Sequence, residues 1–329
     1  MALYTRTTHT IKAAHPRDPS TVTSSDVRLE LVVDEYIIPN SDPSAQTLVL
    51  THGTSFNKRL WEPTISRVLH LIGFTGSIKR ILAIDATNHG ESWLLNAKRL
   101  TEKSHWPDQS RDILETLRYF DVQQPVIGIG HSFGGGILCH AAFMNPHAFA
   151  ATIFVDPILF RMDSQDKIVA TRALKRRDRW DDLESVRSAF AKNKGLADWH
   201  PDVLSLYVEH GTVAYAGSGS TSRTLTTPKE QEAATYLAAP FFELPKCLAA
   251  SQQTHYFVLG AQSIVLPSKD REWIKSISKS PGRVIVLDQA GHLIPMTHPD
   301  QLATELSAIL TDIWNGSRQH RLRSRAERL

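Results

Sequence analysis

Short apolar runs alternate with longer amphipathic stretches along most of this 329-residue chain. Residues 27–38 (VRLELVVDEYII) alternate apolar and polar positions and are rich in β-branched side chains, which predicts a strand. Apolar runs predict further buried strands at 47–50, 80–85, 125–130, 151–156, 255–260 and 283–288, and helical periodicity predicts helices near 57–72, 106–120, 133–144 and 299–314. Strands that alternate with helices indicate a mostly parallel sheet with helices on both faces.

The alternation stops between residues 158 and 250, where the pattern is helical and polar. This stretch predicts an inserted helical cap over the sheet edge. We therefore divide the chain into a first part of the core (1–157), the cap segment (158–250), a second part of the core (251–315) and a basic tail (316–329). Five aromatic residues of the cap segment either line an apolar substrate site or pack the cap onto the core: Trp180, Trp199, Tyr207, Phe241 and Phe242.

Positive charge is concentrated at one end of the chain. Residues 317–329 (SRQHRLRSRAERL) contain five arginines and one glutamate, a net charge of +4, so the residues before them carry −1 of the total of +3. A near-neutral body without a basic face argues against a nucleic-acid partner. We expect the tail to be a frayed, solubilising end.

The composition also bears on the compartment. No run of about 20 apolar residues is present, so we expect no membrane span, and the first residues lack the apolar stretch of a secretory signal. Cys139 and Cys247 do not form a disulfide framework and lack metal-site spacing, which favours a reducing, intracellular compartment. No motif implies a metal or an organic cofactor.

The stretch IGIGHSFGGG (127–136) places a G-x-S-x-G motif between a predicted strand and a predicted helix. A serine in such a sharp turn is held upright at the carboxyl edge of the sheet. Side chains at 130 and 134 would collide with neighbouring elements, and glycine removes that collision. Ser132 is therefore the expected nucleophile.

An acid and a histidine follow other predicted strands, in the order Ser132, Asp156, His292. His292 in DQAGHLIP is the expected base, because a serine hydroxyl needs a neighbouring group to take its proton. Ser263 stands in the loop where a carboxylate is more usual, so Asp156 is the expected acid and orients the imidazole. Asp270 and Asp288 are the alternatives.

The negative charge that develops on a reacting carbonyl oxygen requires backbone donors. His52-Gly53 ends a predicted strand, so the N–H of Thr54 is expected to converge with that of Phe133 in an oxyanion hole. The helix that begins at Phe133 adds its positive end to this site. We expect His52, Trp61 and His131 to contact substrate, with a packing role as the alternative for His131.

The blocks THGTSFNKRLWEP, IDATNHGES, GIGHSFGGG, IFVDP and DQAGHLIP resemble, in order, those of the α/β-hydrolases. The form NHGES is similar to the fungal subgroup of peroxisomal lipases and toxin-biosynthesis hydrolases. The resemblance implies the α/β-hydrolase fold, with the acid at Asp156. It also implies a peroxisomal signal at the end of the chain, where Glu327-Arg328-Leu329 matches the basic and leucine positions of S-K-L but has glutamate for the small residue. The expected location is cytoplasmic or peroxisomal.

These observations predict a serine hydrolase that cleaves an apolar carboxylic ester or thioester, of lipid or secondary-metabolite type, through an acyl-enzyme on Ser132. One alternative uses the same three residues for C–C bond hydrolysis, lyase or cyclisation chemistry, which a substrate panel would distinguish. Another is a hydrolase-like protein that only binds a ligand, which the reactivity of Ser132 would distinguish. The oligomeric state is open, with a homodimer as one option.

Overall fold

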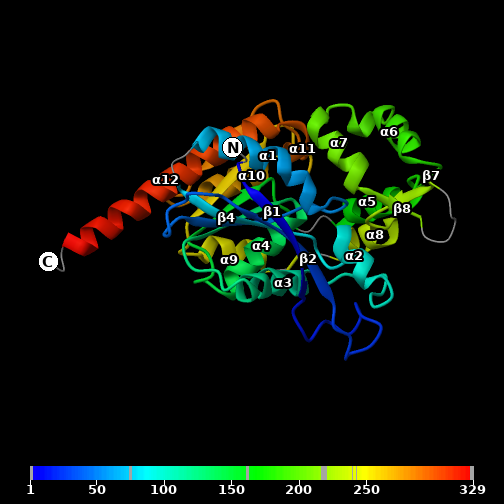
Figure 1. Cartoon of the computed structure of the whole chain (residues 1–329), viewed down its shortest axis with the longest axis horizontal. Coiled ribbons are helices and arrows are strands. Elements are labelled where there is room, and N and C mark those ends of the chain that lie inside the picture. Colours follow the sequence, from blue (N-terminus) through cyan, green and yellow to red (C-terminus); the bar gives the residue numbers. More distant parts are fainter. Residues whose placement is uncertain are drawn as a thin grey trace.

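The computed structural model describes residues 3–73, 76–160, 163–215, 221–238, 240–241 and 243–326. Its central feature is an eight-stranded sheet in the order β1-β2-β4-β3-β5-β6-β10-β11 (Figure 1). The strands are β1 (Thr5–Lys12), β2 (Glu30–Ile37), β3 (Gln46–Thr51), β4 (Ile78–Ile84), β5 (Val126–His131), β6 (Ala151–Val155), β10 (His255–Gly260) and β11 (Val284–Leu287). The last six strands in that order run parallel, whereas β2 is antiparallel to β1 and β4. The predicted, mostly parallel sheet is confirmed.

The three central strands are buried along their whole length, as expected for a sheet covered on both faces. Thr51 of β3 pairs with Gly130 of β5, and His131 of β5 pairs with Val155 of β6. The carboxyl ends of these strands are therefore nearly level. The loops that follow β3, β5 and β6 leave the sheet side by side, which brings distant parts of the sequence together.

Helices cover the sheet on both faces. Those of the main body are α1 (Glu62–Ile72), α2 (Gly90–Asn96), α3 (Trp106–Tyr119), α4 (Phe133–Met144), α10 (Ser268–Ile277), α11 (Ile294–Thr297) and α12 (Pro299–Ala326), with the 3-10 turn η1 (Lys58–Trp61) before α1. α3 and α4 contribute to one apolar cluster, and α1 and α12 contribute to a second cluster on the other face. The two clusters are the two halves of one core, divided by the sheet.

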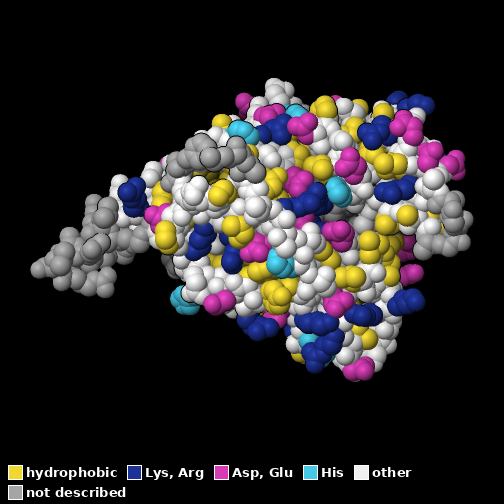
Figure 2. All heavy atoms as spheres, viewed as in Figure 1, with side chains coloured by type: hydrophobic (Ala, Val, Ile, Leu, Met, Phe, Trp, Pro, Cys, Tyr) yellow, Lys and Arg dark blue, Asp and Glu magenta, His cyan; other side chains and the backbone are white. Residues whose placement is uncertain are grey.

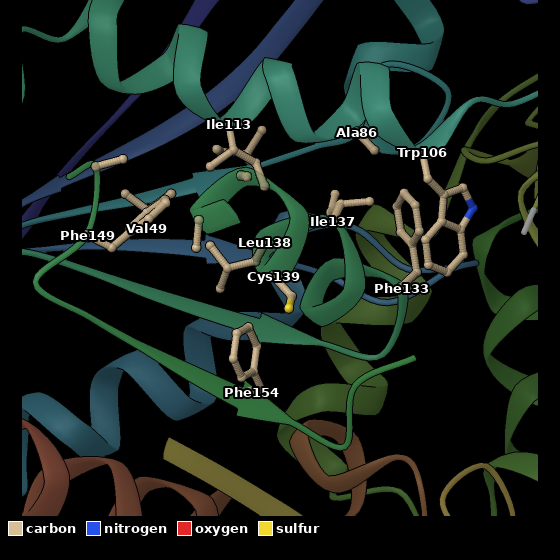
Figure 3. Packing of buried hydrophobic residues seen from close by; sticks show 14 of the residues in the cluster. Val49, Ala86, Trp106, Ile113, Phe133, Ile137, Leu138, Cys139, Phe149 and Phe154 are labelled. Atoms are coloured by element: carbon tan, nitrogen blue, oxygen red, sulfur yellow. The ribbon is translucent and has the colours of Figure 1, made fainter. Parts of the chain in front are cut away.

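The packing of α4 shows how closely helix and sheet approach (Figure 3). Leu138 of α4 is fully buried, and a Cβ added to Gly128 of β5 would lie 2.6 Å from its Cδ1. Glycine in the middle of this strand therefore allows α4 to lie against the sheet. Truncation of a leucine in such a position typically costs about 2–5 kcal/mol of stability.

The cap segment has its own architecture. It contains α5 (Asp163–Lys175), α6 (Leu183–Ala191), η2 (Lys194–Leu196), α7 (Pro201–His210), α8 (Lys229–Leu237) and α9 (Leu244–Ala250), together with a three-stranded sheet of β7 (Arg179–Trp180), β8 (Thr212–Ala214) and β9 (Arg223–Leu225). The sequence pattern predicted helices alone here. Strands of two or three residues are too short for apolar alternation to reveal them. The cap segment except α9 lies at one end of the main sheet (Figure 1).

An aromatic cluster forms the interior of this region. Trp180, Trp199 and Tyr207 are buried in it, and Leu60 and Met296 of the main body join the same cluster. These three aromatic residues thus pack the cap segment onto the core, which was one of the two roles predicted for them; the other was to line an apolar substrate site. Phe241 stacks on His140 with ring centroids 4.7 Å apart, and α9 packs against α4. Phe242 and residues 216–220 lie outside the described residues.

Both ends of the chain differ from expectation. β1 was not predicted and pairs with β2 along its full length at the sheet edge. The frayed tail predicted from residue 316 is wrong for 316–326, because α12 continues to Ala326 and projects from the body (Figure 1). Arginine is a good helix former and no proline interrupts this stretch, so the helix propagates from its packed part. Glu327-Arg328-Leu329 lies outside the described residues.

The surface in the same orientation carries charges of both signs, interspersed with apolar side chains (Figure 2). Several Lys and Arg side chains gather along the lower edge of this view, next to Asp and Glu side chains (Figure 2). In the described parts of the chain, every helix is too short or too polar to cross a bilayer.

Candidate active site

Ser132 forms the turn between β5 and α4, with φ of 56°. An L-residue in this region is strained, because its Cβ approaches the following carbonyl oxygen. A Cβ at Gly130 would lie 2.6 Å from the carbonyl oxygen of Gly134, and a Cβ at Gly134 would lie 2.5 Å from that of Thr51. Glycine is therefore required at both positions, for the reason that the sequence pattern indicated.

Three side chains from three strand ends form one hydrogen-bonded chain. Ser132 Oγ lies 2.8 Å from Nε2 of His292, whose Nδ1 lies 2.6 Å from Oδ2 of Asp156. Asp156 follows β6 and is fully buried, and His292 lies between β11 and α11. Since a carboxylate only accepts, Nδ1 carries the imidazole proton, and the Nε2 lone pair faces the serine hydroxyl. This arrangement can transfer the serine proton to His292.

Ser263, which stands where a carboxylate was considered, takes part in the site in another way. Its hydroxyl donates to Oδ2 of Asp156 at 2.5 Å, and the N–H of Gly260 donates to Oδ1 at 3.0 Å. Asp156 thus accepts from Ser263, Gly260 and His292, which holds its carboxylate in one orientation. No sequence pattern indicated this contact, although Ser263 follows β10, which pairs directly with β6 in the sheet.

The alternative acids lie elsewhere. Asp270 is in the first turn of α10, and Asp288 is an exposed residue directly after β11. The Nδ1 atom of His292 is bonded to Asp156 instead. Of the three carboxylates considered from the sequence, the structure brings Asp156 to the imidazole.

The expected backbone donors lie on two adjoining segments. Phe133 is the first residue of the 12-residue helix α4, where the helix dipole is positive. Thr54 lies in a turn closed by the Phe56 N–H, which donates to the Gly53 carbonyl at 3.2 Å. A Cβ at Gly53 would lie 3.1 Å from the Cβ of Ser132, so this turn lies directly against the nucleophile elbow. Convergence of the Thr54 and Phe133 N–H groups remains a prediction.

His52 and Trp61 are both buried. Nδ1 of His52 donates to the Gly53 carbonyl at 2.8 Å, and Nε2 accepts from the Ala86 N–H at 3.1 Å, so both ring nitrogens are used. Burial lowers the pKa of His52, which matches this neutral form. Trp61 is 2% exposed and belongs to the apolar cluster beneath α1 and α12. Both side chains therefore have structural partners, and their expected contact with substrate stays a prediction.

His131 lies beside the imidazole of His292, with ring centroids 5.2 Å apart. Its Nε2–H donates to the backbone carbonyl of His292 at 2.9 Å, which ties the elbow to the loop that carries the expected base. Burial, with a further contribution from His292, lowers the pKa of His131 to about 3. His131 is therefore neutral at ordinary pH and adds no charge next to His292. Its contact with substrate, like that of His52, stays a prediction.

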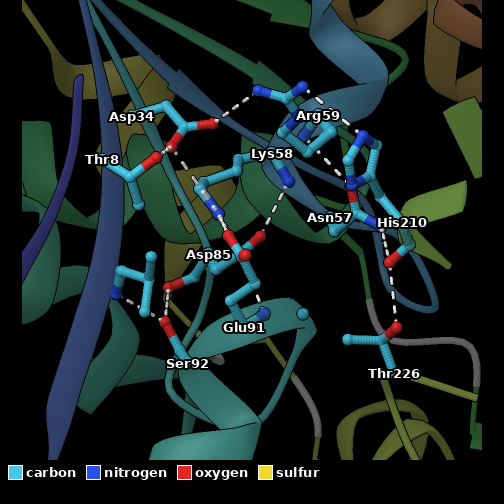
Figure 4. A network of polar contacts seen from close by, with 12 residues as sticks. Thr8, Asp34, Asn57, Lys58, Arg59, Asp85, Glu91, Ser92, His210 and Thr226 are labelled. Atoms are coloured by element: carbon cyan, nitrogen blue, oxygen red, sulfur yellow. Dashed lines mark hydrogen bonds and ion pairs between the residues drawn. The ribbon is translucent and has the colours of Figure 1, made fainter. Parts of the chain in front are cut away.

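An ionic network surrounds buried Lys58, in the segment that follows β3 (Figure 4). We call it the core-side network; its members are Lys58, Asp85, Glu91, Asp34 and Arg59. Nζ of Lys58 contacts Asp85 at 3.0 Å and Asp34 at 3.9 Å and pairs with Glu91. Burial opposes the charge on Lys58, but the three carboxylates outweigh it and raise its pKa. The sequence pattern did not indicate this network, because a buried lysine has no local signature.

The described residues contain no group of three or more His, Cys, Asp or Glu side chains arranged to hold a metal ion. A serine with an adjacent imidazole and an orienting carboxylate is the arrangement used for nucleophilic catalysis.

The sheet, the elbow and the chain order of these residues define an α/β-hydrolase. A model of the alpha/beta hydrolase family matches residues 48–305, and this chain belongs to that family. The Type I acyl-CoA thioesterase mpaH of Penicillium brevicompactum is 31% identical over 263 residues, which cover 70% of this chain and 59% of the relative. This chain thus spans less than two thirds of that relative's length.

Solved structures show the same fold. The peroxisomal alpha-beta-hydrolase Lpx1 of Saccharomyces cerevisiae superposes with a TM-score of 0.82 and 21% identity, covering 95% of this chain and 90% of Lpx1. A thermophilic esterase from Thermogutta terrifontis superposes with a TM-score of 0.63 and 16% identity, covering 93% and 99%. The resemblance to fungal and peroxisomal α/β-hydrolases, predicted from short sequence blocks, is confirmed.

Proposed function

We propose that this hydrolase cleaves a carboxylic thioester or ester by transfer of the acyl group to Ser132. The observation that carries the proposal is the hydrogen-bonded chain from Ser132 through His292 to Asp156, on a strained elbow at the sheet edge. In this mechanism Ser132 is the nucleophile, His292 is the base, and Asp156 orients the imidazole and stabilises its protonated form.

In the first half-reaction, Ser132 Oγ attacks the acyl carbonyl while its proton passes to Nε2 of His292. The carbonyl oxygen becomes an oxyanion, which accepts from the N–H groups of Thr54 and Phe133. Each such donor is worth about 3 kcal/mol in the transition state. The bond to the leaving sulfur or oxygen then breaks, and His292 returns the proton to that atom.

In the second half-reaction, water attacks the acyl-enzyme. His292 takes a proton from the water, the tetrahedral intermediate collapses, and the Ser132 Oγ–acyl bond breaks as Oγ regains a proton. The products are a carboxylic acid and the free enzyme. Water is the co-reactant that balances this second step.

The substrate class that we propose first is a thioester with an apolar acyl group. The name of the Penicillium relative, an acyl-CoA thioesterase, supports this choice over a simple ester. We propose residues 158–250 as the cap that bounds the acyl site, between core parts at 1–157 and 251–315. The peroxisomal description of Lpx1 supports a peroxisomal rather than a cytoplasmic location.

The test is intact-mass labelling with a fluorophosphonate on the wild type, Ser132→Ala and Ser276→Ala. Ser276 is an exposed serine on α10 and serves as the matched control. We expect one adduct on the wild type and on Ser276→Ala, and none on Ser132→Ala. An unlabelled, folded wild type would contradict the mechanism and favour a ligand-binding protein. Initial rates with acyl-CoA and p-nitrophenyl esters of equal chain length then separate the two substrate classes.

A further inference from the structure

Ser55 occupies an unusual backbone position next to the proposed oxyanion donor. It has φ of 77°, and the Phe56 N–H donates to the Gly53 carbonyl across it. Thr54 and Ser55 are thus the two central residues of a tight turn whose second central position has positive φ, where glycine is favoured. A residue with a Cβ is strained in left-handed backbone. The strained serine therefore needs a compensating contact.

That contact comes from the cap segment. Oγ of Ser55 donates to Oε1 of Glu232 at 2.5 Å and lies 3.2 Å from the hydroxyl of Tyr236. Since a serine has one proton and gives it to the carboxylate, the Tyr236 hydroxyl is the donor in the second bond. Glu232 and Tyr236 lie one turn apart on α8. One hydroxyl of the core is thus held by two side chains of one cap helix.

Glu232 is itself fixed. It is 4% exposed, and Nη1 of Arg176, which follows α5, lies 2.9 Å from its Oε2. Nη2 of Arg176 also donates to the hydroxyl of Tyr207 on α7 at 3.3 Å. We call Ser55, Glu232, Tyr236, Arg176 and Tyr207 the cap-side network. It joins three helices of the cap segment to one turn of the core.

We propose that Glu232 is a positioning residue, which acts through Ser55 to hold the turn that presents the Thr54 N–H to the oxyanion. The cap segment then completes the catalytic geometry as well as bounding the acyl site. The inference rests on the proposed function, because Thr54 matters only if an oxyanion forms.

The physical consequence is specific to the transition state. The turn presents its N–H to a charge that exists only during reaction, so a displaced turn weakens transition-state binding more than substrate binding. A shift of about 1 Å can cost on the order of 100-fold in rate. We therefore expect Ser55→Ala and Glu232→Ala each to lower kcat by about 10- to 100-fold, with KM changed less than about threefold.

Two substitutions at Ser55 separate this role from a structural one. Ser55→Gly and Ser55→Ala both remove the hydroxyl, but glycine tolerates positive φ, so the glycine variant should be more stable than the alanine variant. We expect both variants to show the same loss of kcat. If activity followed stability instead, with Ser55→Gly near the wild-type rate, the proposal would be overturned.

A transition-state analogue gives the second readout. The inhibition constant of a trifluoromethyl ketone, which forms an oxyanion on Ser132, should rise in each variant by the same factor by which kcat/KM falls. The kcat/KM of the double variant Ser55→Ala/Glu232→Ala should fall no further than that of either single variant, because both substitutions remove the same contact between Ser55 and Glu232. Additive losses, or an unchanged inhibition constant, would contradict the proposal.

The matched control is Glu184→Ala, which removes another arginine-paired glutamate of the cap segment with its side chain 80% exposed. We expect wild-type kinetics from it. An inactive wild type that fails to label with fluorophosphonate would contradict the proposed function itself. An active wild type with equally active Ser55 and Glu232 variants would contradict only the positioning role.

Discussion

Two polar networks hold the segment after β3, and they differ in where their members come from. In the core-side network, Asp34 lies on β2, Asp85 follows β4 and Glu91 lies on α2, all within the main body. In the cap-side network, the partners of Ser55 lie on or next to helices of residues 158–250. Arg59 of the core-side network also reaches the cap segment, where its Nη2 lies 3.4 Å from Nε2 of His210 on α7 (Figure 4). The carboxylates that hold Lys58 thus lie in the main body, whereas the carboxylate that holds Ser55 lies in the cap segment.

This difference teaches that burial alone does not assign a role to a polar contact. Lys58 and Glu232 are both buried charges with opposite partners. Loss of Lys58 leaves carboxylates uncompensated inside the main body, so its effect falls on stability. Loss of Glu232 releases a turn beside Ser132, so its proposed effect falls on turnover.

The largest expected effect is a loss of kcat on substitution of the proposed acid. Asp156→Asn should lower kcat by about 10⁴-fold while the protein stays folded, because the amide favours the wrong imidazole tautomer. Steady-state kinetics with urea unfolding as the control measure both parts. Near-normal turnover in a folded variant would assign the role of the acid to Asp270 or Asp288. The kcat losses expected in the cap-side network would then have no catalytic variant to be compared with.

The next effect tests the core-side network. Lys58→Met should lower the free energy of unfolding by about 3–5 kcal/mol, since it leaves buried Asp85 without its cation. Lys12→Met is the matched control, because Lys12 pairs with Glu30 on the surface with its side chain 68% exposed. It should change stability by less than about 1 kcal/mol. Equal effects in the two variants would remove the distinction between the networks.

The smallest expected effect concerns His255, a residue of neither network, and is a loss of stability at acidic pH. Burial, with a smaller contribution from Lys279, lowers the pKa of His255 to about 4, and its ring bonds to the hydroxyls of Thr152 and Ser251. As the pH falls, the His255 imidazole takes up a proton in the unfolded chain before it does so in the folded one. The contribution of His255 to the free energy of unfolding is therefore complete above pH 6.5 and is lost towards pH 4, by at most about 1.4 kcal/mol per pH unit.

We expect His255→Gln to flatten that part of the stability profile, measured by urea unfolding at several pH values. His70→Gln, at an exposed histidine of α1, is the control and should leave the slope unchanged. An unchanged slope in His255→Gln would assign the pH dependence to other groups whose pKa is lowered by burial, such as His131.

The predictability of the fold followed the length of each element. The buried strands around Ser132 were visible because runs of several apolar residues next to glycine and proline have few other interpretations. β7, β8 and β9 have two or three residues each and were invisible for that reason. β1 was missed although it has eight residues, because its mostly polar, exposed side chains carry no burial pattern.

Some contacts of the candidate site could likewise be predicted from the sequence, and others could not. Ser132, Asp156 and His292 each follow a predicted strand, and parallel strands bring their carboxyl ends to one edge, so their proximity could be inferred. The contact between Ser263 and Asp156 could not, since it depends on how two loops bend. The bond from Ser55 to Glu232 joins residues 177 positions apart across the cap segment, which no local pattern encodes.

By itself, the sequence determined the class of this protein, the elbow and the order of its three polar residues, because those follow from local sterics and from strand periodicity. Only the tertiary structure decided which buried charges pair, that the cap segment has its own small sheet and aromatic cluster, and that its α8 helix reaches the turn carrying Thr54. Such contacts depend on the packing of whole elements, where shifts of an ångström decide which polar atoms meet.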